Sequence, residues 1–287
     1  MTLPRNPEGK REGERERERA ETELRDVALR ILLEPDLDAK LRLPPYATPD
    51  ERPGPALIID RPARPAGLEI VPSRDARVPP LEGMADPSQR PRILHALANH
   101  ELQAVELFAW ALLAFPDAPR EFRAGLLALI GDEQRHTLAY AERLAEWDVR
   151  LGDFPVTGYF WSKVPALGTP LRFVCAMGLT FENANLDHCA DYAAVARAAG
   201  DRRTADLLER VAADEVEHVR FGVRWLEAWR EEGRSQLETY SRNVTWPLRA
   251  ALARGRNFHA GPRERAGLDP QFIRALSEAD RSAGPDE

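Results

Sequence analysis

The chain has 287 residues, of which 43 % are hydrophobic and 30 % are charged, so it can form one large domain or two small ones with a substantial core. Its net charge of −7 argues against a nucleic-acid partner, because proteins that bind nucleic acid usually present a basic face. No apolar run reaches the ~18 residues that a membrane span requires, and the charged N-terminus lacks the apolar segment of a signal peptide, so we expect a soluble cytoplasmic protein.

The first 89 residues are predicted to form two regions. Residues 1–20 alternate Glu and Arg with almost no apolar side chains, so we expect a disordered charged tail. Residues 21–89 begin with a short amphipathic helix that stops at Pro35. Because 12 of the 24 prolines lie between Pro44 and Pro91, we expect the rest of this region to be an extended arm that wraps around the following domain.

From residue 90 onward the apolar residues recur with helical spacing. We predict four long helices, over residues 90–114, 119–149, 170–198 and 202–232. Short connections make the first two helices one antiparallel hairpin and the last two another. The segment Gly152–Thr169, about 18 residues, is long enough to join the hairpins along the length of a bundle. We therefore predict an all-α, ferritin-like four-helix bundle over residues 90–232, followed by a C-terminal extension over residues 233–287.

The motif Asp-Glu-x-x-His occurs in the second and the fourth predicted helix. Its carboxylate and imidazole are three residues apart, so both lie on one helix face and can hold the same metal ion. Both also lie on the apolar stripe of their helix, where an ionised glutamate is costly unless it is paired or bound to metal. The two motifs supply four candidate metal ligands, Glu133, His136, Glu215 and His218.

The first and third predicted helices each place one more glutamate on an apolar stripe, Glu101 and Glu182. Glu101 precedes Glu133 by 32 residues and Glu182 precedes Glu215 by 33, so the two hairpins repeat one spacing. One Glu from each of two helices, with Glu-x-x-His from each of the other two, is the pattern of di-iron and di-manganese carboxylate proteins. Oxygen-rich ligation suits two iron or manganese ions better than a structural zinc ion. Chance explains one surface motif, but not two with matching partners on core-facing stripes.

Further residues are candidates for contacts around the metal ligands. Asp132 and Asp214 are expected to accept a hydrogen bond from a ligand histidine. Each points about 100° away from the neighbouring ligand, so the alternative is a solvated or capping aspartate. Tyr140 lies one turn beyond His136 and is either a core-packing residue or a redox-active or hydrogen-bonding neighbour of the site. Asn185 lies one turn from Glu182 and is a candidate for a hydrogen bond into the site. Glu106 lies on another face of the first helix and is expected to pair outside the site, with a role as an alternative ligand as the second interpretation.

Several short segments together resemble a known family. They are His95-Ala96-Leu97-Ala98, Glu101-Leu102, Asp132–His136, Gly152-Asp153-Phe154-Pro155, Glu182, Leu186-Asp187, Asp214–His218, Val219, Gly222, Arg224 and Trp225. These residues resemble an uncharacterised bacterial ferritin-like family, catalogued as domain of unknown function 455, and the resemblance covers nearly all of the chain. The chain departs from typical members at Asn99, where they have His, and at Ala184-Asn185, where they have Arg-Gly. A more distant resemblance is to the ferritin-like hydroxylases that modify tRNA.

The predicted site favours an enzyme, a non-haem di-iron oxidase or oxygenase of the hydroxylase type. It would use dioxygen as co-substrate on an unknown small molecule, with electrons from a donor protein or from the substrate. No catalytic residue is predicted beyond the metal ligands. The alternatives are an iron-handling ferroxidase, a tRNA-modifying hydroxylase and a di-manganese catalase-like enzyme. The sequence leaves the native metal open, and it leaves open whether the chain forms a homodimer.

Overall fold

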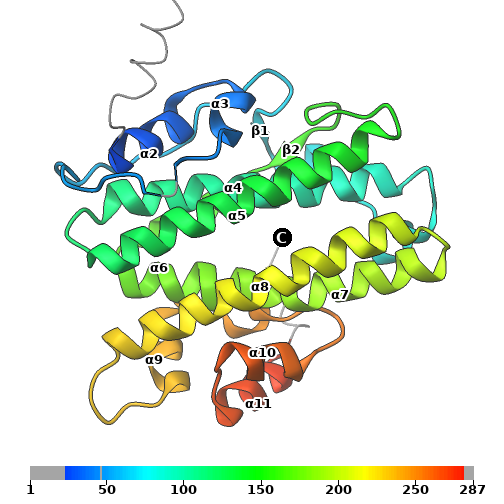
Figure 1. Ribbon diagram of the computed structural model, residues 1–287. Coiled ribbons are helices and arrows are strands. Elements are labelled where there is room, and N and C mark those ends of the chain that lie inside the picture. Colours follow the sequence, from blue (N-terminus) through cyan, green and yellow to red (C-terminus); the bar gives the residue numbers. More distant parts are fainter. Residues whose placement is uncertain (1–22, 46, 281–287) are drawn as a thin grey trace, which may run out of the picture.

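The computed structural model describes residues 23–45 and 47–280, so the charged tail expected over residues 1–20 lies outside the described part. The described chain is mostly helical, which confirms the all-α prediction (Figure 1). None of its helices has both the length and the apolar character needed to cross a membrane.

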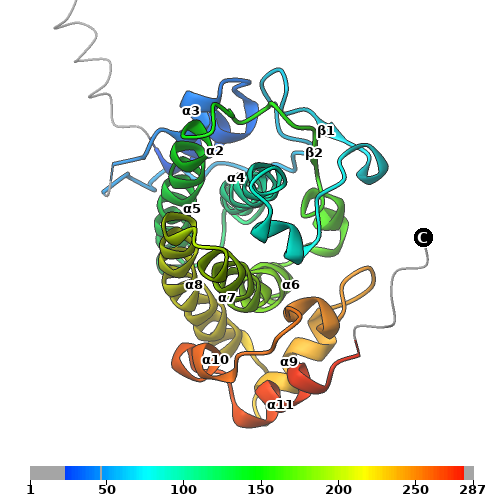
Figure 2. The ribbon, with the colours of Figure 1, turned by 90° about the vertical axis from the view of Figure 1, so that its right-hand side faces the viewer.

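Four long helical segments lie side by side in the described chain (Figure 1 and Figure 2). They are α4 (Arg90–Ala114), α5 (Arg120–Ala145), the continuous run of α6 (Pro170–Ala176), η4 (Met177–Phe181) and α7 (Glu182–Ala198), and α8 (Arg202–Trp229). The most extensive contacts join α4 to α5 and α7 to α8, so the chain forms the two predicted hairpins. The second helix was predicted to extend to residue 149, but α5 ends at Ala145. Asp148 has a left-handed backbone (φ 56°) that cannot continue a helix.

The third long segment is not one regular α-helix, contrary to the prediction over residues 170–198. Met177–Phe181 forms a π-helical turn, and Thr180 Oγ1 donates to the carbonyl oxygen of Cys175 over 2.8 Å. A Cβ atom added at Gly178 would lie 3.0 Å from the Cα of Gly222, so glycine lets this turn approach α8 closely. The turn ends directly before Glu182 and therefore sets the direction in which that candidate ligand points.

The N-terminal arm packs against the first hairpin. α2 (Leu24–Leu33) lies on α4, and α3 (Leu37–Leu41) lies on α5. Further along the arm, β1 (Ile70–Val71) pairs in parallel with β2 (Val156–Thr157) of the segment that joins the hairpins, a contact that the sequence did not predict. The remaining short helices of these two regions are η1 (Ser73–Asp75), η2 (Leu81–Ala85) and η3 (Trp161–Ala166).

The C-terminal extension packs against the second hairpin. Its elements are α9 (Gln236–Asn243), η5 (Ala250–Ala253), α10 (Ala260–Ala266) and α11 (Pro270–Glu278). A fully buried ion pair fastens it, since Arg263 donates to both carboxylate oxygens of Asp187 on α7 over 2.7 and 2.9 Å. The amide of Gly255 donates to the same carboxylate over 2.8 Å. The extension therefore holds a fixed position over α7.

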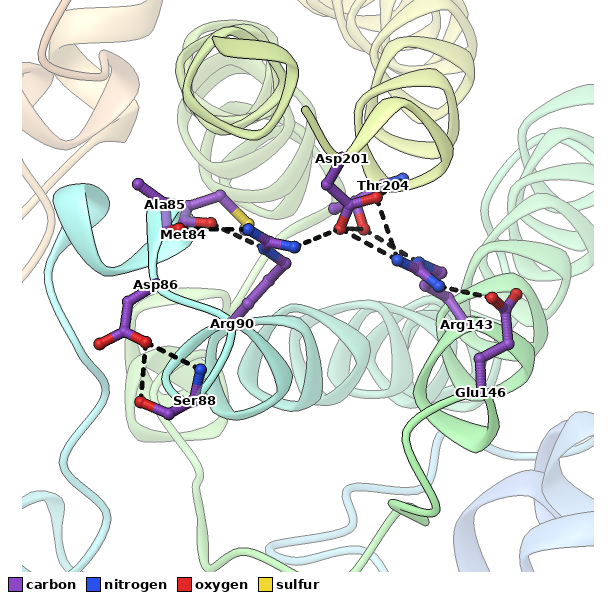
Figure 3. Close-up of polar contacts among 9 residues, drawn as sticks. All are labelled: Met84, Ala85, Asp86, Ser88, Arg90, Arg143, Glu146, Asp201 and Thr204. Carbon is purple, nitrogen blue, oxygen red and sulfur yellow. Dashed lines mark hydrogen bonds and ion pairs between the residues drawn. The ribbon is translucent and has the colours of Figure 1, made fainter. Parts of the chain in front are cut away.

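A polar cluster fastens one end of the four long segments (Figure 3). Asp201 caps α8 by accepting a hydrogen bond from the amide of Thr204. The same carboxylate accepts from Arg90 of α4 over 2.7 Å and from Arg143 of α5 over 3.0 Å. One side chain at the turn between α7 and α8 thus joins both hairpins.

Replacing Asp201 with Asn is expected to lower the free energy of unfolding by about 1.5–3 kcal/mol, because the charged hydrogen bonds to Arg90 and Arg143 are lost. Asparagine still caps α8, so the loss reports the hairpin contact rather than the cap. Urea denaturation measures the change. Asp206→Asn is the control, since Asp206 is exposed and pairs with exposed Arg197, and it should change stability by less than about 0.5 kcal/mol. Equal losses in both variants would contradict the assignment.

His95 of α4 makes stability depend on pH. Its Nε2 accepts a hydrogen bond from the amide of Gly152 over 2.9 Å, which requires a neutral ring. Burial lowers the pKa of His95 from 6.5 to about 4, so its contribution is complete above pH 6.5 and is lost as the pH falls towards 4. Between pH 7.5 and 5 the wild type should lose about 2 kcal/mol more than His95→Gln, as measured by urea denaturation at each pH. Parallel pH profiles for the two proteins would contradict this.

Candidate metal centre

The structure brings the six predicted ligands together between the four long segments. α4 and α7 each contribute one glutamate, whereas α5 and α8 each contribute a Glu-x-x-His pair, as the sequence predicts. Each of the six side chains is at most 4 % exposed. They are Glu101, Glu133, His136, Glu182, Glu215 and His218.

The ligand atoms form two overlapping groups of four. In each group one candidate ligand atom per residue lies within 4.8 Å of the others. The first group is Glu101, Glu133, His136 and Glu215, and the second is Glu133, Glu182, Glu215 and His218. Glu133 and Glu215 belong to both groups. The cluster can therefore bind a metal ion, and the two groups overlap through Glu133 and Glu215.

Both histidines turn Nδ1 towards the glutamates and Nε2 away from them. Nδ1 of His218 lies 2.9 Å from Glu133 and 3.0 Å from Glu215, and Nδ1 of His136 lies 3.2 Å from Glu133. Nε2 of His136 lies 3.1 Å from Asp214, and Nε2 of His218 lies 3.4 Å from Asp132. Each aspartate thus contacts the histidine of the opposite motif. A ring that donates Nε2–H to a carboxylate keeps the Nδ1 lone pair for a metal.

Several buried polar atoms of this cluster lack a hydrogen-bond partner among the described residues. They are Oε1 of Glu182, and Nδ1 of His218 together with the two carboxylate oxygens that it faces at ion-pair distance, Oε1 of Glu133 and Oε2 of Glu215. Buried polar atoms are normally paired, and an exception in a native protein is commonly explained by a bound ion or water. These atoms come from the four residues of the second group, and oxygen and imidazole donors together suit iron or manganese. The residues present therefore fit a bound metal ion.

The shifted pKa values of the cluster also fit a site that binds a metal ion. Burial raises the pKa of Glu101 and of Glu182 well above the usual range, and neighbouring carboxylates add to the rise. Burial opposes protonation of His136, but hydrogen bonds to Asp214 and Glu133 outweigh it and raise the pKa of His136 to about 9. Without a metal the cluster balances its buried carboxylates with protons. Metal binding at such sites releases protons, so affinity should fall as the pH falls.

Two further predicted residues lie beside the cluster. Asn185 Nδ2 donates to Oε1 of Glu215 over 2.9 Å, so it fixes the orientation of one shared carboxylate. Tyr140 is fully buried, and its hydroxyl forms no good hydrogen bond with a described residue, although Cys189 lies beside it. Burial raises the pKa of Tyr140 well above the usual range, so the phenol stays protonated.

Glu106 lies outside the cluster, as the sequence predicts. It pairs with Lys40 over 3.2 Å and with Arg64 over 2.7 Å, and both cations come from the N-terminal arm. Trp161 Nε1 of the segment between the hairpins donates to it over 2.9 Å. No sequence pattern identified these partners, because they lie 42 to 66 residues away.

The model of one protein family, described as "Protein of unknown function (DUF455)", matches residues 23–274. The chain belongs to this family. The match spans the arm, the four long segments and nearly all of the C-terminal extension. All three regions of this DUF455 protein therefore belong to the part of the chain that the family shares. Searches of curated proteins and of solved structures gave no match to the chain.

The sites where this DUF455 protein departs from the expected family pattern have defined contacts. Asn99 Oδ1 accepts from Arg64 over 2.9 Å, and Asn99 Nδ2 donates to the carbonyl oxygen of Thr157 over 3.0 Å. Asn99 therefore ties α4 to both the arm and β2. Asn185, the second such position, contacts Glu215 directly. The departures leave all six candidate ligands unchanged.

Proposed function

We propose that this DUF455 protein is a ferritin-like dimetal carboxylate oxidoreductase, a non-haem di-iron oxidase or oxygenase. The observation that carries the proposal is the pair of overlapping ligand groups that share Glu133 and Glu215. Two metal ions bound side by side need carboxylates that reach both, and two shared glutamates meet that need. The same ligand set also accepts manganese.

In this proposal Glu133 and Glu215, the members of both groups, would help to hold both metal ions. Glu101 and His136 would complete one set of ligands, and Glu182 and His218 of α8 would complete the other. Two ferrous ions bound there would supply the electrons that dioxygen activation requires. Dioxygen would be the co-substrate, and a reductant from outside the chain would restore the ferrous state.

The surrounding side chains have three tasks. Asp214 and Asp132 hold the histidine rings with Nδ1 directed inwards. Asn185 donates to Glu215 and limits the rotation of that carboxylate. Apolar clusters fill the space between the helices on either side of the ligands along the helix axes, and Tyr140 is a buried phenol one turn beyond His136.

The packing of the outer faces favours an enzyme over an iron-storage cage. A cage subunit assembles through the outer faces of its helices. Here α2 covers part of α4, and α10 covers part of α8. The arm and the extension therefore occupy surfaces that a simple cage would need.

The test is to purify the protein anaerobically, measure iron and manganese per chain, and expose the reduced protein to dioxygen. We expect about two iron ions per chain and oxygen uptake in proportion to bound iron. Glu133→Ala should show neither. A folded wild-type protein that binds neither iron nor manganese would overturn the proposal. Two manganese ions with rapid peroxide breakdown would instead establish the catalase-like alternative.

A further inference from the structure

A cavity of about 360 Å³ lies directly beside the candidate metal centre. Its wall combines α4, the segment between the hairpins, η4 with α7, and the C-terminal extension. Asn185 lines the cavity and also donates to Glu215, so one side chain separates the cavity from a shared ligand. His100 and Phe181 line it as well, and each is the chain neighbour of a candidate ligand. A molecule in this cavity would lie next to the metal centre.

The polar side of the cavity is cationic. The positive charge comes from Arg249 and Arg254 of the C-terminal extension; His100 and His188 line the cavity as well, and no described aspartate or glutamate does. Among the described residues, Arg254 also lies over the ring of Phe258, with its guanidinium carbon 5.3 Å from the ring centroid. Nε of Arg254 is buried without a hydrogen-bond partner among those residues, although its Nη1 donates to the carbonyl oxygen of Ser277. A buried guanidinium N–H without an acceptor favours an anion in the cavity.

Aromatic side chains form much of the remaining lining of the cavity. The rings of Phe160 and Phe181 stack with their centroids 4.5 Å apart and their planes 18° from parallel. Tyr159 packs edge-on against Phe181 at 5.9 Å, and the imidazole of His100 lies 5.3 Å from Phe160. Aromatic walls of this kind accept planar or aliphatic groups. The volume is in the range of small-molecule pockets.

We propose that this cavity binds the substrate of the dimetal centre, and that the substrate is a small anion with a planar apolar body. Its carboxylate or phosphate group pairs with Arg249 and Arg254, while its body lies against Phe160 and Phe181. This inference rests on the proposed function for the reaction, but not for the binding itself. The C-terminal extension, which supplies both arginines, is then the element that selects the substrate.

The test measures binding of 2-naphthoate, 2-naphthyl phosphate and neutral 2-naphthamide to the full-length protein by calorimetry. We expect at least one anion to bind about tenfold more tightly than the amide, and the stronger anion identifies the charged group. Arg249→Gln and Arg254→Gln should each weaken that anion about tenfold. Arg242→Gln, which changes an exposed arginine on α9 outside the cavity, should leave its affinity unchanged. Equal binding of anion and amide, or no effect of either cavity variant, would overturn the proposal.

A second arm separates this inference from the proposed function. The same titrations are done with Glu133→Ala, whose metal content is measured in parallel. Arginine-dependent binding that persists in this variant supports the cavity as the anion site, even if the wild type holds no metal. If binding requires metal and is unchanged in both arginine variants, the anion binds the metal directly. That result would overturn the cavity proposal and leave the metal centre standing.

Discussion

Replacing Glu133 or Glu215 with Ala is expected to remove both metal ions, whereas replacing Glu101 or Glu182 should remove only one. The reason is that the first two glutamates belong to both ligand groups, and the last two belong to one group each. When one of the four protein ligands of a metal ion is removed, the site loses both a ligand atom and a negative charge, so its affinity for the metal ion falls strongly. Metal content should thus fall from about two ions per chain to near zero in the first pair of variants and to about one in the second.

The measurement is metal per chain by mass spectrometry on anaerobically purified proteins. Circular dichroism must show that each variant is folded. We expect it to be, because the apolar clusters that pack the four long segments together are unchanged in all four variants. Glu82→Ala is a suitable control, since Glu82 is exposed and pairs with exposed Arg256. Its metal content should equal that of the wild type.

Two outcomes would contradict this assignment. If all four variants lose metal equally, the cluster holds a single ion or binds two only together. If Glu101→Ala loses both ions and Glu133→Ala loses one, the shared carboxylates are the pair from α4 and α7 instead. Either result would require a different division of the six ligands.

The predictable part of this site is the part that helix periodicity determines. Residues three apart on a helix must share a face, so the pairing of Glu133 with His136 followed from the sequence. Equal spacing in the two hairpins likewise placed Glu101 and Glu182 at the level of the motifs. The sequence predicted that Asp214 contacts a ligand histidine, but not that this histidine is His136 of the other motif, because that depends on how two separate helices are rotated against each other.

The parts that the sequence did not reveal are set by contacts between distant segments. The π-helical turn before Glu182 adds one residue to a turn, and apolar periodicity does not resolve a single added residue. The pairing of β1 with β2 involves only two residues on each side. The cavity beside the metal centre is built from four regions, and its arginines lie more than 60 residues beyond Asn185 in the chain. No local pattern marks such a site.

The second large effect, on the free energy of unfolding, is expected for the buried ion pairs that join the N-terminal arm to α4. Glu106, Lys40 and Arg64 have side chains that are at most 3 % exposed, and the carboxylate contacts both cations. Burial lowers the pKa of Lys40, and the charge of Glu106 opposes that change. Without this carboxylate, two buried cations would face each other without compensation.

Glu106→Ala should therefore lower the free energy of unfolding by about 3–5 kcal/mol, the usual cost of leaving a buried charge unpaired. Urea denaturation at matched metal content measures the change, with the exposed pair variant Glu82→Ala expected to cost less than about 0.5 kcal/mol. Lys40→Met combined with Glu106→Gln should cost less than the sum of the single variants, because one cation leaves with the carboxylate. Additive costs would show that the two side chains do not interact. The arm can also detach before the helices unfold. In that case a protease should cleave Glu106→Ala within residues 43–89 while α4 to α8 stay folded, and this result would still show that Glu106 holds the arm on the helices.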